Sequence, residues 1–185
     1  MPTDRQLSFV ANVRLTTENK ALCAAETYFG RPFMSKITRS SGVVSKVKNL
    51  SNLVSIWDNS SKFLSLYLRH TNGGYHLYVR SADQRGHGLY LNSEGMLFLR
   101  EVDRSPDVFQ LSDGKTHNLL IDPDATGGTS QLYLYHRTLK QLIGSKTYRQ
   151  SASTFTAVQA GGTPLPLDIE VIEVNSPYLG NPNEV

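Results

Sequence analysis

Cysteine is almost missing from this 185-residue chain, which contains only Cys23. An intrachain disulfide is therefore excluded, and a hydrophobic core has to stabilise the fold, which a chain of this length can build. A semi-buried free thiol is the favoured interpretation of Cys23, over a redox or catalytic role. Scarce cysteine fits a reducing compartment and is compatible with export after folding.

Long apolar runs are missing as well. No apolar stretch approaches the ~18 residues of a membrane span, so we expect no membrane insertion. The first 15 residues lack the continuous apolar segment of a signal peptide. No apolar stripe with helical period persists for three turns, and Tyr, Phe, Val and Leu occur in short runs instead. The sequence therefore predicts an all-β fold.

Catalytic and metal-binding patterns are also lacking. The five histidines are scattered, and no cysteine or carboxylate completes a ligand set around them. Neither Gly127-Gly128 nor Gly161-Gly162 stands between a strand and a helix, as a phosphate loop would require. The acidic residues of the middle region fit turns and surfaces better than a catalytic pair. We predict a protein that is not an enzyme and uses no metal or cofactor.

Hairpin patterns are what the sequence does contain. The apolar run Gly88–Leu91 leads into Asn92–Gly95, and a second apolar run, Met96–Leu99, follows before Phe109. Asn, Ser and Gly supply the hydrogen bonds and positive φ angles that reverse a chain, so this segment predicts a hairpin.

The same pattern recurs along the chain. Strand–turn–strand segments are expected at Phe33–Ile37 with Val43–Val47, Leu64–Arg69 with Tyr75–Val79, and Gln131–Tyr135 with Leu142–Gly144. Phe155 is expected to follow the Gln131–Gly144 segment in the same way as Phe109 follows the Gly88–Leu99 hairpin. Diverged β repeats of this kind favour a β-trefoil, a pseudo-threefold closed barrel with a hairpin cap, which leaves no exposed sheet edge.

The expected domain limits follow from this pattern. Residues 1–21 are predicted to be a flexible N-terminal arm, residues 22–174 the β-trefoil domain, and residues 175–185 a disordered tail. Within the domain, Pro164–Val174 alternates apolar and acidic residues, which is typical of a half-exposed strand. This segment is interpreted either as the last trefoil strand or as an added edge strand.

Charge is distributed unevenly, although the net charge is only +3. The segments from Thr27 to Trp57 and from Ala125 to Leu167 contain basic residues but no acid. The first and third repeats of a trefoil are neighbours, so these segments are expected to form one basic face that attracts polyanions. A solvated surface without a partner is the alternative interpretation.

The most informative basic segment is Tyr135–Gln150. Its four cations alternate with hydroxyl and amide residues, which together suit sulfate and phosphate oxygens. Binding of nucleic acid would usually add stacking aromatics, and within the basic strip that begins at Arg137 only Tyr148 is aromatic. A sulfated glycan is therefore favoured over nucleic acid.

This segment also resembles a known family. His136-Arg137-Thr138, separated by five residues from Gly144–Thr147 and followed by Gln150, is similar to the heparin-binding segment of the fibroblast growth factors. The hairpin unit resembles a strand pair of that family, and Phe109 with Asn118 matches another of its motifs. The resemblance covers roughly residues 22–158.

The resemblance implies a secreted signalling ligand with a β-trefoil fold. Its partners would be heparan sulfate or heparin and a cell-surface receptor tyrosine kinase with immunoglobulin-like domains. The glycan-binding residues would be Arg137, Thr138, Lys140, Lys146, Thr147, Arg149 and Gln150. The receptor-binding residues would be Asn118, Tyr90 and Gln110.

Three other classes of function remain open. One is a trefoil lectin, although the sequence has a single tryptophan, Trp57, and no Gln-x-Trp repeats of the ricin type. Another is an intracellular protein-interaction module without receptor activity, and the third is a trefoil protease inhibitor that would act through an exposed loop. Extracellular localisation, by leaderless export or after removal of a leader, is expected for the growth-factor interpretation, and cytoplasmic or nuclear localisation for the alternative.

Overall fold

The computed structural model describes residues 3–16, 20–29, 32–38, 44–57, 63–81, 86–117, 119–121, 129–150 and 153–174. The elements are β1 (Phe9–Leu15), β2 (Ala21–Ala24), α1 (Ala25–Phe29), β3 (Met34–Thr38), β4 (Val44–Asn49), β5 (Val54–Trp57), β6 (Leu64–Thr71), β7 (Gly74–Val79), β8 (His87–Leu91), β9 (Leu97–Glu101), β10 (Val108–Ser112), β11 (Thr129–His136), β12 (Gln141–Gln150), β13 (Ser153–Ala160), β14 (Thr163–Pro164) and β15 (Leu167–Val174). The all-β prediction is confirmed. Within the described ranges, no helix has the length and apolar character needed to cross a bilayer.

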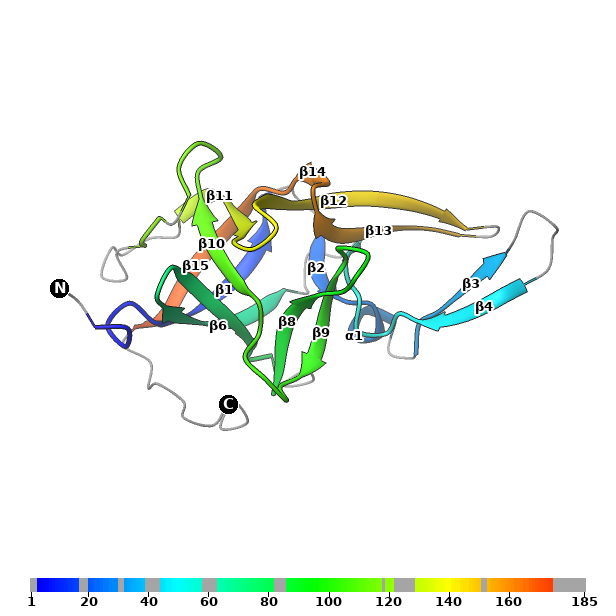
Figure 1. Cartoon of the computed structure of the whole chain (residues 1–185), viewed down its shortest axis with the longest axis horizontal. Coiled ribbons are helices and arrows are strands. Elements are labelled where there is room, and N and C mark those ends of the chain that lie inside the picture. Colours follow the sequence, from blue (N-terminus) through cyan, green and yellow to red (C-terminus); the bar gives the residue numbers. More distant parts are fainter. Residues whose placement is uncertain are drawn as a thin grey trace.

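The centre of the molecule is a closed antiparallel barrel of six strands. The ring runs β1–β6–β7–β10–β11–β15 and back to β1. The closing pair joins distant parts of the chain, with Phe9 opposite Val174 and Leu15 opposite Leu167 (Figure 1). Each of the six strands is paired on both sides, so the ring itself presents no free edge.

Three hairpins are inserted between successive ring strands. They are β2–β5 after β1, β8–β9 after β7, and β12–β13 after β11. Backbone pairing connects all three: Leu53 bridges to Phe98, Met96 to Gln159, and Thr156 to Ile56. The hairpins lie on the side of the barrel away from the N-terminus (Figure 1).

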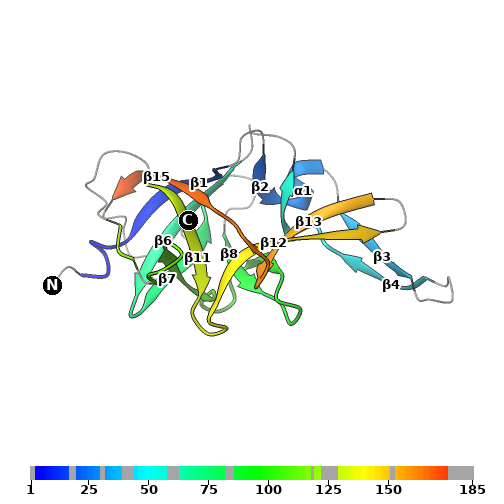
Figure 2. The ribbon, with the colours of Figure 1, turned by 90° about the horizontal axis from the view of Figure 1, so that it is seen from above.

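The β3–β4 hairpin is separate from the large sheet. Its two strands form a two-stranded sheet of their own, inserted in the sequence between β2 and β5. It extends from the barrel in the same direction as the β12–β13 hairpin, as both views show (Figures 1 and 2).

Alternating apolar residues fill the barrel. Phe9, Leu77 and Phe109 have no solvent exposure, and ring strands and hairpins contribute to the same cluster. Each fully buried side chain of this size contributes about 1.5–3 kcal/mol. A second, aromatic cluster lies under the hairpins, where Trp57 and Phe155 both contact Phe33.

Several predicted hairpins are present. The segments expected around residues 64–79 and 88–99 are β6–β7 and β8–β9, and the segment at residues 131–144 forms β11 and the start of β12. The segment at residues 33–47 is also a hairpin, β3–β4, but it lies outside the ring and its hairpins. Phe155 is not equivalent to Phe109, because Phe155 belongs to a hairpin strand and Phe109 to a ring strand.

The flexible arm predicted for residues 1–21 is wrong for its middle part. Phe9–Leu15 is ring strand β1, and Phe9, Ala11 and Val13 are at most 2% exposed. Their two-residue spacing directs these side chains into the barrel, while the residues between them face outward. At the other end, the Pro164–Val174 segment contains β15, which pairs with both β1 and β11, so it is a ring strand and not an added edge. The predicted tail, residues 175–185, lies outside the described residues.

Candidate functional site

The predicted glycan site begins at the turn between β11 and β12. Residues 137–140 are all exposed, and backbone bonds fix the turn at both ends. Arg137 N donates to Val108 O over 3.1 Å, and Lys140 N donates to His136 O over 2.9 Å. Lys140 closes the turn in the left-handed region with φ of 53°. The turn thus presents Arg137, Thr138 and Lys140 from a backbone that is tied to the barrel.

The Arg137 side chain reaches a second turn. Its Nη1 donates to the carbonyl oxygen of Asn72, over 2.9 Å, in the β6–β7 turn. Gln110, one of the predicted receptor residues, donates from Nε2 to the neighbouring carbonyl of Gly73 over 2.8 Å. The structure therefore brings residues of the two predicted sites together at one turn, where both bind backbone oxygens.

The remaining glycan residues lie along β12. Lys146 pairs with Ala157 and Thr147 with Thr156, so the two side chains point to opposite faces of the strand. Lys146 Nζ lies 5.5 Å from the centre of the Tyr148 ring. Thr147 Oγ1 lies 3.1 Å from Thr156 Oγ1, within hydrogen-bonding distance. The strip is therefore divided between two faces. The side chains of Arg149 and Gln150 lie outside the described part.

An acidic residue lies close to this strip. Burial raises the pKa of Tyr148, and the negative charge of Glu94 raises it further. Glu94 belongs to the turn between β8 and β9, which meets β13 through the bridge from Met96 to Gln159. The Arg137–Gln150 segment contains no acidic residue, but the fold places the carboxylate of Glu94 close to it.

Among the predicted receptor residues, Tyr90 is 4% exposed. Its hydroxyl donates to the carbonyl oxygen of Arg104 over 2.6 Å. Burial raises the pKa of Tyr90 to about 12, and the charge of Asp103 adds to the shift. Asn118 lies outside the described residues, so the prediction for it is untested.

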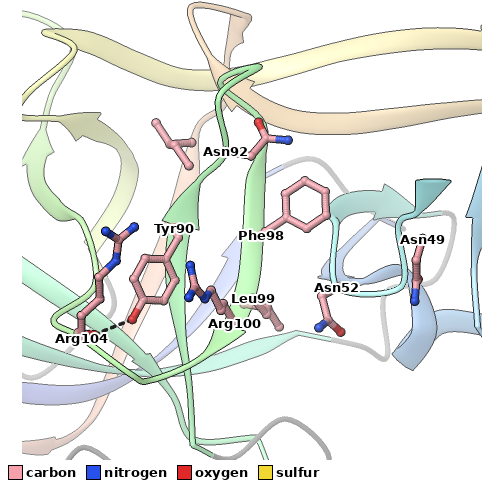
Figure 3. Close-up of a pocket in the computed structure, with 9 residues that line it drawn as sticks. Asn49, Asn52, Tyr90, Asn92, Phe98, Leu99, Arg100 and Arg104 are labelled. Carbon is pink, nitrogen blue, oxygen red and sulfur yellow. Dashed lines mark hydrogen bonds between the residues drawn. The ribbon is translucent and has the colours of Figure 1, made fainter.

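A pocket of about 370 Å³ lies beside Tyr90, and the sequence did not predict it (Figure 3). It is lined by Asn49, Asn52, Tyr90, Leu91, Asn92, Phe98, Leu99, Arg100 and Arg104. Strand pairing explains part of this set. Tyr90 is opposite Phe98, and Arg100 lies two residues further along β9, so the three side chains share the outer face of the hairpin. The alternate residues Leu89 and Leu97 are buried in the barrel core.

The pocket has two distinct sides. Tyr90 and Arg104 lie on one side, and Asn49 and Asn52 on the other, where the chain leaves β4 (Figure 3). The guanidinium carbons of Arg100 and Arg104 are each 5.9 Å from the centre of the Tyr90 ring. Arg100 also forms an ion pair with Asp103. A small ligand here would meet two cations, side-chain amides and an aromatic ring.

The outer face of the β8–β9 hairpin could have been found from the sequence. In Gly88–Leu91 and Met96–Arg100, leucines alternate with Tyr90, Phe98 and Arg100, which indicates a second, non-leucine face. The contribution of Asn49 and Asn52 had no local signal, because it depends on how the chain after β4 meets the hairpin.

Comparisons with protein-family models, with curated proteins and with solved structures gave no match. The likeness to fibroblast growth factors therefore rests on the motif residues. Within the described ranges, no group of three or more His, Cys, Asp or Glu residues is arranged to hold a metal ion.

Proposed function

We propose that this protein is a β-trefoil that binds sulfated glycan, as the resemblance to fibroblast growth factors implies. Three features support the trefoil. The six-stranded ring is closed, a hairpin follows every second ring strand, and each hairpin pairs with the other two. This is the arrangement expected of three strand–hairpin–strand units around a pseudo-threefold axis.

The exposure of the β11–β12 turn is the observation that carries the glycan proposal. Arg137, Thr138 and Lys140 are all exposed within four residues, and their backbone is anchored to Val108 and His136. Two cations and a hydroxyl on a fixed turn can bind sulfate oxygens at a small cost in ordering. Lys146 extends the cationic surface along one face of β12.

The resemblance further implies a signalling role through a receptor with immunoglobulin-like domains. Tyr90 and Gln110 bind backbone carbonyls, so in this proposal they shape the receptor-facing loops and leave direct contact to exposed neighbours. A secreted ligand of this type would use glycan to hold ligand and receptor together, which raises their effective concentration.

Salt-dependent elution from heparin tests the glycan proposal. We expect Lys140→Ala to elute at lower salt than the unchanged protein, and Arg137→Ala combined with Lys140→Ala to elute lower still. The slope of log affinity against log salt should fall by about one for each cation removed. Lys115→Ala is the matched control, because Lys115 is exposed beyond the other end of β10. Equal elution of Lys140→Ala and Lys115→Ala would refute the site.

A further inference from the structure

The polar groups that face the β8–β9 pocket are mainly hydrogen-bond donors. Asn49 Oδ1 accepts from Ser51 N over 2.9 Å. Asn92 Oδ1 accepts from the backbone N–H groups of Glu94 and Met96, each over 2.9 Å. These amide oxygens are therefore already engaged. Within the described part of the chain no hydrogen bond engages either Nδ2, so these donors are left to offer a ligand.

The two arginines add further donors. Arginine carries five N–H donors and no acceptor. Among the residues that the structure describes, no hydrogen bond or ion pair engages the Arg104 guanidinium, which lies over the Tyr90 ring. Arg100 is paired with Asp103 but retains a side chain that is 52% exposed. A ligand with a carboxylate or sulfate group offers only acceptor oxygens to these donors. A neutral sugar would match them less well, because its hydroxyl groups are donors as well as acceptors.

Apolar surface is present in the same pocket. Phe98 and Leu91 are both half-buried and line it. The C–H face of a sugar ring can pack on such surface, while its polar substituents bind donors at the rim. The pocket volume of about 370 Å³ is at the small end of ligand sites, which suits one or two sugar units.

From these observations we propose that this pocket binds an acidic sugar unit, held through its carboxylate or sulfate group. Arg104 is the principal cation, Asn49 and Asn92 supply neutral donors, and Phe98 packs on the ring. The proposal concerns residues separate from the β11–β12 turn and does not depend on heparin binding there.

Titration of the ¹⁵N-labelled protein followed by NMR tests the proposal. The protein is produced in bacteria, so that Asn49, which begins an Asn-Leu-Ser sequence, stays unmodified. The ligands are methyl glucuronide, N-acetylglucosamine 6-sulfate and neutral methyl glucoside. We expect saturable shifts at Phe98 and Arg104 with a Kd of about 1 mM for an acidic sugar, the range that suits so small a ligand. The neutral glycoside should bind about tenfold more weakly.

Two variants connect this binding to the pocket. Arg104→Gln should weaken binding of the acidic sugar about tenfold, because it removes the charge that assists the hydrogen bonds. Asn49→Asp should weaken it too, because it replaces donors with a negative charge. Arg14→Gln is the matched control, since Arg14 is an exposed arginine on β1, and it should bind as the unchanged protein does.

Each result decides the proposal. Binding of only the carboxylate or only the sulfate ligand supports it and identifies the acidic group. Equal binding of the neutral glycoside, absence of saturation at about 20 mM, or unchanged binding by Arg104→Gln would each overturn it. Heparin elution from the β11–β12 turn is a separate measurement, so failure of one proposal does not imply failure of the other.

Discussion

Asp107 connects the two candidate sites, and its removal gives the sharpest test of how they are held together. Its Oδ2 accepts a hydrogen bond from Leu91 N, over 2.7 Å, at the end of β8. The same oxygen lies 3.5 Å from His136 Nε2, at the end of β11. His136 Nδ1 accepts from Leu139 N over 3.1 Å, so in the neutral ring the proton is on Nε2 and faces Asp107.

The expected cost of Asp107→Ala follows from these contacts. A hydrogen bond to a charged group contributes about 1.5–3 kcal/mol, and a lower value applies here because the Asp107 side chain is 31% exposed. We expect the free energy of unfolding to fall by about 1.5–2 kcal/mol at pH 7. For a chain of this size that corresponds to a loss of about 3–8 °C in Tm. Urea denaturation followed by tryptophan fluorescence and thermal circular dichroism measure the two quantities.

The pH dependence separates the charge from the shape of the side chain. Burial acts to raise the pKa of Asp107, but the neighbouring His136 ring and the hydrogen bond from Leu91 outweigh it, so the pKa lies below its ordinary value of 3.8. A lowered pKa means that the folded state favours the carboxylate more than the unfolded chain does. The stabilisation is therefore complete well above pH 3.8 and is lost as the pH falls through the folded-state pKa.

Asp107→Asn is the appropriate comparison, because it keeps the shape and does not titrate. The difference in unfolding free energy between the unchanged protein and Asp107→Asn should be constant from pH 7 to about pH 5 and shrink below about pH 4. A difference that stays constant down to about pH 2.5, or a cost of Asp107→Ala below about 0.5 kcal/mol at pH 7, would refute the reasoning.

Two further predictions concern the backbone of the barrel. Lys140 has φ of 53°, so Lys140→Gly should raise the free energy of unfolding by about 0.5–1 kcal/mol, whereas Lys140→Ala should not raise it; a loss in the glycine variant on urea denaturation would contradict this. Gly74 has φ of 152°, and a Cβ there would lie 2.4 Å from the carbonyl oxygen of Phe109. Gly74→Ala should therefore separate β7 from β10 and cost about 3 kcal/mol or more; a cost below about 1 kcal/mol would show that the ring can adjust.

Local sequence patterns predicted the local pairings. The β6–β7 and β8–β9 hairpins each combine two short apolar runs with a turn of Asn, Gly and Ser, and neighbouring strands of this kind pair directly. The all-β class follows from the same observation. The trefoil itself, as a proposal, depends on how the hairpins meet, which local patterns do not specify.

Pairings between distant segments were not evident in the sequence. Strand β1 pairs with β6 and β15, and its alternation of Phe9, Ala11 and Val13 is obscured in the sequence by apolar Val10 and polar Asn12 between them. From the sequence alone, a short strand among polar residues cannot be distinguished from a flexible arm, because its pairing partners are distant in the chain. The β3–β4 hairpin shows the converse, because its local signal is clear and yet, among the strands that the structure describes, its two strands pair only with each other.

The candidate sites divide in the same way. The β11–β12 turn is one continuous segment, so its exposed cations could be predicted from spacing and composition. The pocket draws its polar groups from the end of β4 and the chain that follows it, and from the β8–β9 hairpin and the loop after it, and only the closed fold brings these segments side by side. Its chemistry could therefore not be inferred from any single motif.

The structure also changes how the motif should be weighed. His136 is 5% exposed, and its ring binds Leu139 N and faces Asp107, so folding alone explains a histidine at this position. Gly144 lies where a Cβ would be 2.3 Å from the carbonyl oxygen of Thr163, so close approach of β14 explains this glycine. Neither residue needs a ligand to account for it.

What remains of the motif is its exposed part. Arg137, Thr138 and Lys146 are exposed, and the Lys146 ammonium lies 5.5 Å from the centre of the Tyr148 ring. If a glycan ligand accounts for these residues, removing Lys146 should alter heparin elution and leave stability unchanged, because exposed substitutions of this kind usually stay within about 0.5 kcal/mol. Removing His136 should instead lower stability and leave heparin elution unchanged. If the two variants differ in this way, the likeness to growth factors reflects glycan binding. If they do not, the likeness reflects residues that the fold itself requires.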